Sequence, residues 1–208
     1  MSAIDASELL RPGLLEGISL LVVDPAGRDE LVSESLGQAA HETCARLGAR
    51  VHVHARESQA ADPSAGEAAV GAAVTTAVSA IGGIDMLIVD GAAIFASEGL
   101  EGCLEGAWEA TRAVVNLAFL PAGPSLSTRR ILYLAPSPAA GERGDAARAG
   151  LENLARTLST EWARHGITVV TIAPGAHTPA GEVAALCAYL ASPAGAYFSG
   201  CLLDLRGP

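Results

Sequence analysis

The chain has 208 residues, of which 50% are hydrophobic and 17% are charged, and its net charge is −10. This composition excludes a disordered chain, and the negative charge argues against nucleic acid as a partner, because binding phosphates needs a basic face. All 13 basic residues are Arg; the absence of Lys excludes Schiff-base chemistry. We expect one folded domain over residues 1–208.

The N-terminal stretch MSAIDASELLRPGLLEG carries acidic residues and no long apolar run, so we expect neither a signal peptide nor a membrane span. The four cysteines are scattered, without a Cys-x-x-Cys pair, which predicts buried, reduced thiols in a cytoplasmic protein. They are Cys44, Cys103, Cys187 and Cys201.

Taken in chain order, the hydrophobic patterns alternate between short apolar runs, typical of buried strands, and longer periodic stretches, typical of helices. Strands are predicted over residues 18–23, 49–56, 84–90, 129–136, 167–173 and 201–205, and helices over about 29–47, 66–83, 104–120, 145–165 and 181–192.

Strands that alternate with helices and are apolar throughout predict a parallel sheet covered on both faces. The expected fold class is α/β, a doubly wound, Rossmann-like sheet of about six strands. In such folds ligands bind beyond the carboxyl ends of the strands.

Several segments resemble the short-chain dehydrogenase/reductase family. AGLENLARTLSTEWARHGITVVTIAPG is similar to the segment that follows the family's catalytic Tyr-x-x-x-Lys, and EVAALCAYLASPAGAYFSGCLLDLRG is similar to its C-terminal segment. GGIDMLIVDGAA takes the place of the strand before N-N-A-G, and LGQAAHETCARLGARVHVHAR that of the first helix and second strand. The resemblance implies a fold shortened between the second strand and the following helix.

The family's catalytic residues are missing at the matching positions. Tyr-x-x-x-Lys aligns with Gly144 and Arg148, and the catalytic Ser falls near Ala135 and Pro136. Gly144 has no side chain to transfer a proton, and Arg148 can hold a hydroxyl or phosphate but cannot titrate as a Lys does. We therefore predict a divergent member without the Ser-Tyr-Lys set.

The cofactor motifs are altered as well. N-N-A-G aligns with residues 89–92, VDGA, and in the Gly-rich loop only the last glycine, Gly37, is kept, while Ser35 replaces the middle one. Acidic residues in this turn, Asp24 among them, would repel a pyrophosphate. Arg56 ends the second strand, where the resemblance implies a contact with the 2′-phosphate of NADP(H).

These changes predict a non-catalytic structural or regulatory subunit without classical redox activity. The most family-like segments, Arg148 to Trp162 and Glu182 to Leu205, are those that the resemblance places at subunit interfaces. We expect either a homo-oligomer or a hetero-oligomer with a catalytically active relative.

Two kinds of enzyme stay open beside this hypothesis. Asp90, Tyr133 and His177, at or near strand ends, could form a cofactor-independent acid–base site. Alternatively Gly37, Arg56 and Arg148 could bind NADP(H) in a residual oxidoreductase, although we expect no cofactor. A small-molecule binding module is the third alternative.

Structural explanations compete with these assignments. Asp90 could be a capping residue and His177 a solvated loop residue, and we expect Trp108 and Trp162 to pack. His52 and His54 point to one face of a strand, but no third ligand is marked by spacing, so we expect no metal.

Overall fold

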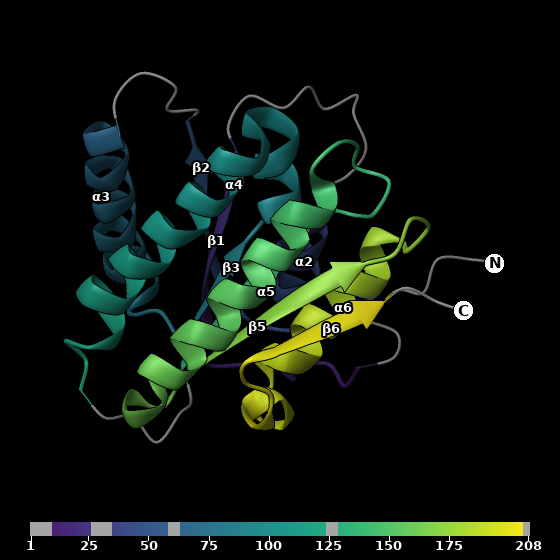
Figure 1. The fold of residues 1–208 in the computed structure, drawn as a ribbon. Helices are drawn as coiled ribbons and strands as arrows, with labels where there is room; N and C mark the ends of the chain where they lie inside the picture. The colour runs from purple at the N-terminus through teal and green to yellow at the C-terminus, as the bar shows by residue number, and fades with distance from the viewer. Residues whose placement is uncertain (1–9, 26–34, 58–62, 124–128, 206–208) are drawn as a thin grey trace.

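The computed structural model describes residues 10–25, 35–57, 63–123 and 129–205. These form one α/β unit around a central sheet (Figure 1).

The sheet has six strands, all parallel, in the order β2-β1-β3-β4-β5-β6. This confirms the predicted Rossmann-like class and the strand count. The strands are β1 (Ser19–Pro25), β2 (Arg50–Arg56), β3 (Met86–Val89), β4 (Arg129–Leu134), β5 (Ile167–Pro174) and β6 (Cys201–Leu205).

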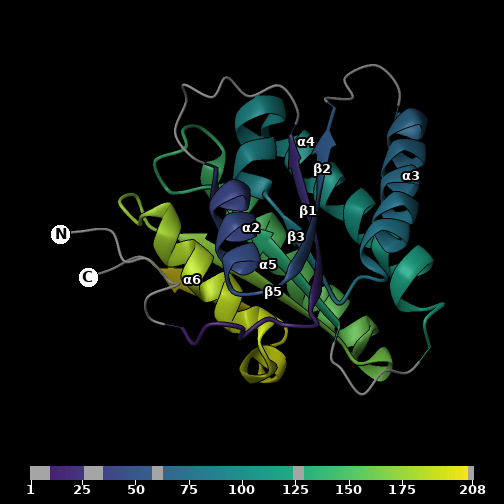
Figure 2. The same cartoon turned by 180° about the vertical axis from the view of Figure 1, so that it is seen from behind.

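Five longer helices cover the two faces of the sheet. The face toward the viewer in Figure 1 carries α3 (Pro63–Ile81), α4 (Gly91–Val114) and α5 (Gly144–Glu161). The opposite face carries α2 (Leu36–Arg46) and α6 (Ala180–Ala191), as Figure 2 shows. Three short elements complete the described part: a π-helical turn, η1 (Val115–Phe119), and the 3₁₀ turns η2 (Ala163–His165) and η3 (Pro193–Tyr197).

The core consists of two apolar layers, one on each face of the sheet. β3 and β4 are buried along their whole length, which explains why the sequence of β3 and the sequence of β4 after its two arginines do not alternate between apolar and polar residues. β2 lies at one edge of the sheet, and its side chains are accordingly more exposed and more polar.

The predicted start of the third helix was wrong. α4 begins at Gly91 rather than near Leu104, because the side chain of Asp90 accepts a hydrogen bond from the Ala93 amide and caps the helix. Gly99 interrupts the helix with φ 72°, a left-handed conformation that glycine adopts without steric cost, and this hid the earlier turns from a periodicity argument.

α2 also begins later than predicted, at Leu36, with Ser35 as its N-cap; the predicted helical residues 29–34 lie outside the described part of the chain.

All four cysteines are free thiols, and three are buried, while Cys201 is half-buried. Burial raises the pKa of the Cys44 and Cys103 thiols to about 12, which keeps them protonated at neutral pH. No described helix combines the length and apolar character that crossing a bilayer requires.

Candidate functional site

The crevice expected for this fold lies between β1 and β3, the topological switch point at which the order of the strands reverses. The register pairs Val23 with Val89, so the next residue of each strand, Asp24 and Asp90, is brought to the same point. Side chains alternate along strands, and both carboxylates therefore face α2. The candidate site begins with two acidic side chains at the carboxyl end of the sheet.

Asp90 is fully buried and bridges two helix N-termini. One carboxylate oxygen accepts a hydrogen bond of 2.9 Å from the Ala93 amide in α4. The other accepts a hydrogen bond of 2.7 Å from the Gly37 amide in α2. A negative charge is favoured beside both helix N-termini, because their unpaired N–H groups carry partial positive charge.

Ser35 completes this arrangement. Its hydroxyl accepts from the Gln38 amide at 2.8 Å and lies 2.8 Å from a carboxylate oxygen of Asp24, to which it donates. A methyl group at Gly37 would lie 3.1 Å from an Asp90 oxygen, so the glycine permits a close approach between the helix and the carboxylate. The N-terminus of α2, where a bound pyrophosphate would sit, already carries two carboxylates of the protein itself.

Arg56 ends β2 and is only 3% exposed. Its guanidinium forms a short ion pair with Glu98 and lies 3.5 Å from Glu109, both on α4. A methyl group at Gly106 would come within 3.1 Å of Nε, so this glycine leaves space for the guanidinium. The arginine that was predicted to bind a 2′-phosphate is thus enclosed by two carboxylates of α4.

Arg148, on the first turns of α5, lies where the resemblance implied the catalytic Lys. Its Nη1 donates to the carbonyl oxygens of Pro136 at 2.7 Å and Pro174 at 2.8 Å, and Nη2 lies 3.8 Å from Asp204. The guanidinium therefore ties together the ends of β4, β5 and β6. Gly144, at the Tyr position, is buried and contributes no polar side chain.

Tyr133 is fully buried on β4, and its hydroxyl lies 2.8 Å from the Thr111 hydroxyl on α4. Burial raises the pKa of Tyr133 well above its usual value, although the hydrogen bond with Thr111 lowers it in part. A phenol in this position stays protonated at neutral pH and serves as a buried hydrogen-bonding group.

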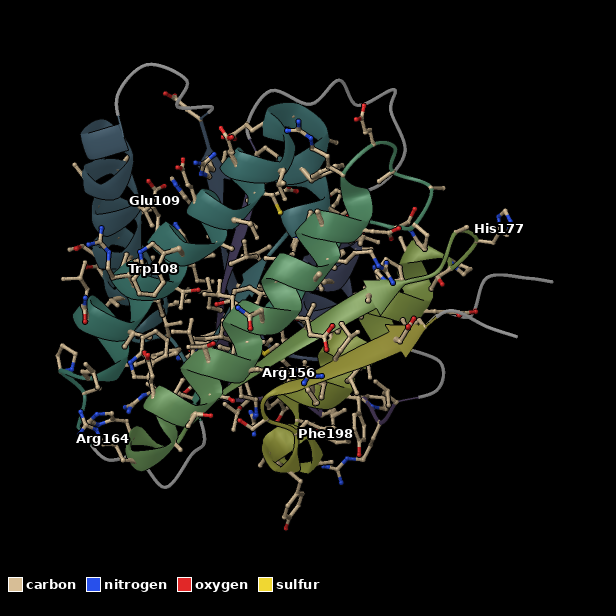
Figure 3. The ribbon with its side chains drawn as sticks, viewed as in Figure 1. Trp108, Glu109, Arg156, Arg164, His177 and Phe198 are labelled. Atoms are coloured by element: carbon tan, nitrogen blue, oxygen red, sulfur yellow. The ribbon has the colours of Figure 1, made fainter. Side chains whose placement is uncertain are left out.

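The structure does not bring Asp90, Tyr133 and His177 together. Tyr133 pairs with Val89 in the sheet, so it faces α4, whereas Asp90, one residue after Val89, faces α2. His177 is exposed on the loop after β5 and points away from the molecule (Figure 3). Of the predicted nucleotide-binding residues, only Gly37 lies at the α2 N-terminus, and Arg56 and Arg148 are engaged elsewhere by the protein.

His52 and His54 lie on the edge strand β2, both partly exposed. Burial and the nearby His52 and Arg56 charges lower the pKa of His54, so it is more weakly basic than a free histidine. Within the described residues, no three His, Cys, Asp or Glu side chains gather closely enough to hold a metal ion.

Sequence reasoning missed the partners that decide what these side chains do. Glu98 lay outside the predicted helix, so its ion pair with Arg56 was not foreseen. The bond from Gly37 to Asp90 joins residues 53 positions apart, and only the strand order places them together. A usable signal was present in the Asp-Gly-Ala-Ala sequence at 90–93, which is typical of a helix start.

Comparison with solved structures agrees with this fold. The chain is similar to a citronellol catabolism dehydrogenase of Pseudomonas aeruginosa, with 27% identity over 96% of this chain and 97% of that one, and a TM-score of 0.72. A hydroxysteroid dehydrogenase of Escherichia coli matches with 17% identity over 94% and 98% of the two chains and a TM-score of 0.72. A 3-ketoacyl-(acyl-carrier-protein) reductase of Brucella melitensis, complexed with NADH, matches with 23% identity over 92% and 98% and a TM-score of 0.70.

No protein-family model matches the sequence, and the search of curated proteins gives no match. The structural neighbours are dehydrogenases and reductases, several of them described as short-chain dehydrogenases/reductases, and the chain has the fold of that group.

Proposed function

We propose that this protein is a non-catalytic structural or regulatory subunit, built on the short-chain dehydrogenase/reductase fold and without NAD(P)-dependent hydride transfer. It acts by association, either with further copies of itself or with a catalytically active relative. Its fold neighbours are oxidoreductases, and the proposal is that this chain has kept their architecture without their reaction.

The observation that carries the proposal is the hydrogen bond from the Gly37 amide to the buried carboxylate of Asp90. A dinucleotide needs the N-terminus of α2 for its pyrophosphate. In this protein the carboxylate of Asp90 neutralises the partial positive charge at that helix end, and Asp24 adds a second negative charge beside Ser35. The residues at this position do not fit a pyrophosphate, because like charges in a partly buried site repel strongly.

The remaining nucleotide-binding candidates point the same way. Arg56 is neutralised by Glu98 and Glu109, and a 2′-phosphate would have to displace a buried carboxylate to reach it. Arg148 uses its donors on the Pro136 and Pro174 carbonyls. A residual NADP(H)-dependent oxidoreductase would require both guanidinium groups to leave these partners.

An association surface is available on the face formed by α4 and α5, which lie side by side (Figure 1). Trp108 on α4 is 40% exposed rather than packed as predicted, whereas Trp162 packs against the core. Leu104 on α4 and Leu154 on α5 are half-buried, and Gly150 allows α5 to approach Leu104 closely. Large aromatic side chains of this kind contribute most to binding energy at interfaces.

Light scattering coupled to size exclusion tests this surface. We expect the wild-type protein to form a dimer or larger oligomer, and Trp108→Glu to weaken association by roughly 10- to 100-fold, the effect of losing a central aromatic contact. Leu117→Glu is the matched control, because Leu117 is 50% exposed but lies beside α3.

The homo-oligomer would be excluded by a wild-type protein that stays monomeric at about 100 µM, a concentration at which a stable oligomer is fully formed. Mixing the protein with an active relative of the same fold would then test whether a hetero-oligomer forms. We expect Trp108→Glu to abolish that complex and Leu117→Glu to preserve it. An unchanged complex with both variants would show that this face is not the interface.

A further inference from the structure

A hollow lies at the end of the sheet where β4 and β5 begin. It has a volume of about 440 Å³, within the range of small-molecule sites, and its walls include Phe119, Leu120, Arg129, Arg164 and His165. Arg164 marks this end in Figure 3, opposite the strand ends near His177. The hollow is therefore separate from the crevice between β1 and β3.

Part of the lining of the hollow is a cation beside an aromatic ring. Arg129 is 8% exposed, and its guanidinium carbon lies 5.8 Å from the centre of the buried Phe119 ring. Nη1 donates to the Gly123 carbonyl at 2.8 Å, which fixes the side chain in place. A guanidinium has five N–H donors, so Arg129 has donors for a ligand beyond the one that bonds to Gly123.

Arg164 and His165 add further basic groups to the lining. Nε of Arg164 lies 3.0 Å from Nε2 of His165, to which it donates, and both side chains are exposed on the η2 turn. Among the described residues that line the hollow none is acidic, although the chain has a net charge of −10. The arrangement concentrates positive charge and selects an anion.

A π-helical turn supplies the apolar part of the walls. The Leu120 amide donates to the Val115 carbonyl at 2.9 Å, one residue further than in an α-helix, and this wide turn carries Phe119 and Leu120. Such turns are rare and are found often at functional sites. Leu120 is 39% exposed, so an apolar group of a ligand can cover it.

The backbone amides around the hollow indicate whether it suits a phosphate or a carboxylate. Phosphate sites usually present several free backbone amides. Here the amides of Gly123 and Gly166, which also line the hollow, already donate to the carbonyls of Leu120 and Ala163. A planar guanidinium fits a carboxylate through paired hydrogen bonds, and the apolar walls favour a tail over a second charge.

We propose that this hollow binds a small amphipathic carboxylate, a monocarboxylic acid with a short aryl or alkyl tail. The carboxylate pairs with Arg129 and Arg164, and the tail covers the exposed side chain of Leu120. This site is independent of the proposed loss of redox activity, because it uses no residue of the crevice between β1 and β3.

Calorimetric titration with 3-phenylpropionate tests the site, with its neutral amide and inorganic phosphate as comparison ligands. We expect saturable binding of the acid with a dissociation constant of roughly 0.1–1 mM, and at least about tenfold weaker binding of both comparison ligands. Arg129→Gln should abolish binding, and Arg164→Gln should weaken it by about fivefold or more. Arg11→Gln, at an exposed arginine elsewhere, should leave it unchanged.

Arg164 is exposed, so Arg164→Gln tests the site even if Arg129→Gln does not fold. The proposal is overturned if the acid shows no saturable binding up to about 10 mM, or if Arg164→Gln binds it as the wild type does. Binding of phosphate or of the neutral amide as tight as that of the acid would overturn it as well.

Discussion

Replacing Arg56 by methionine should lower the free energy of unfolding by about 3–5 kcal/mol, the cost of breaking a buried ion pair. Methionine fills much of the same space but leaves Glu98 and Glu109, which are 9% and 14% exposed, facing each other without a counter-charge. Urea denaturation followed by circular dichroism gives the change as a shifted midpoint at constant slope.

Two variants distinguish charge from packing. Arg56→Met combined with Glu98→Gln and Glu109→Gln should recover about half of the loss, because the stranded charges are gone. Arg156→Met removes an exposed pair with Glu152 and should change stability by no more than about 0.5 kcal/mol. If Arg56→Met were as stable as the wild type, Arg56 would not be held as described and would be available to a nucleotide.

Asp90→Ala should destabilise the protein by about 3 kcal/mol, since one buried carboxylate accepts two amide hydrogen bonds. Its loss leaves the Gly37 and Ala93 amides without this acceptor. Asp90→Asn should cost about half as much, because its carbonyl still accepts from Ala93 while its amide group cannot accept from Gly37. Thermal and urea unfolding measure both.

Glu105→Ala is the control on the same helix, as Glu105 is exposed, and we expect a change within about 0.5 kcal/mol. A loss for Asp90→Ala no larger than that of Glu105→Ala would contradict the bridging role of Asp90. It would also remove the reason for excluding a pyrophosphate from α2.

Most of the fold was predictable because buried parallel strands leave a strong signal. Apolar runs such as MLIV in β3 and ILYL in β4 alternate with helical stretches, and this alternation indicates the class of sheet. The start of α4 was not predictable by periodicity, since Gly99 and Gly102 interrupt its pattern. The π-helical turn at its end has no sequence signature at all.

The candidate site was less predictable, because it depends on which face each side chain takes. Asp90 and Tyr133 both come from neighbouring strands, yet the pairing of Val89 with Tyr133 places them on opposite faces. A shift of one residue in register would have reversed this. The number and type of polar residues could be read from the sequence, but their partners required the register and the helix positions.

The central claim is that the protein's own carboxylates take the place of a cofactor phosphate at the start of α2. Calorimetric titration of the wild-type protein with NADPH and NADH at low salt tests it most directly. We predict no detectable binding of either nucleotide at about 1 mM. Saturable binding with a dissociation constant near about 10 µM would contradict the claim and restore hydride transfer as the function to be tested.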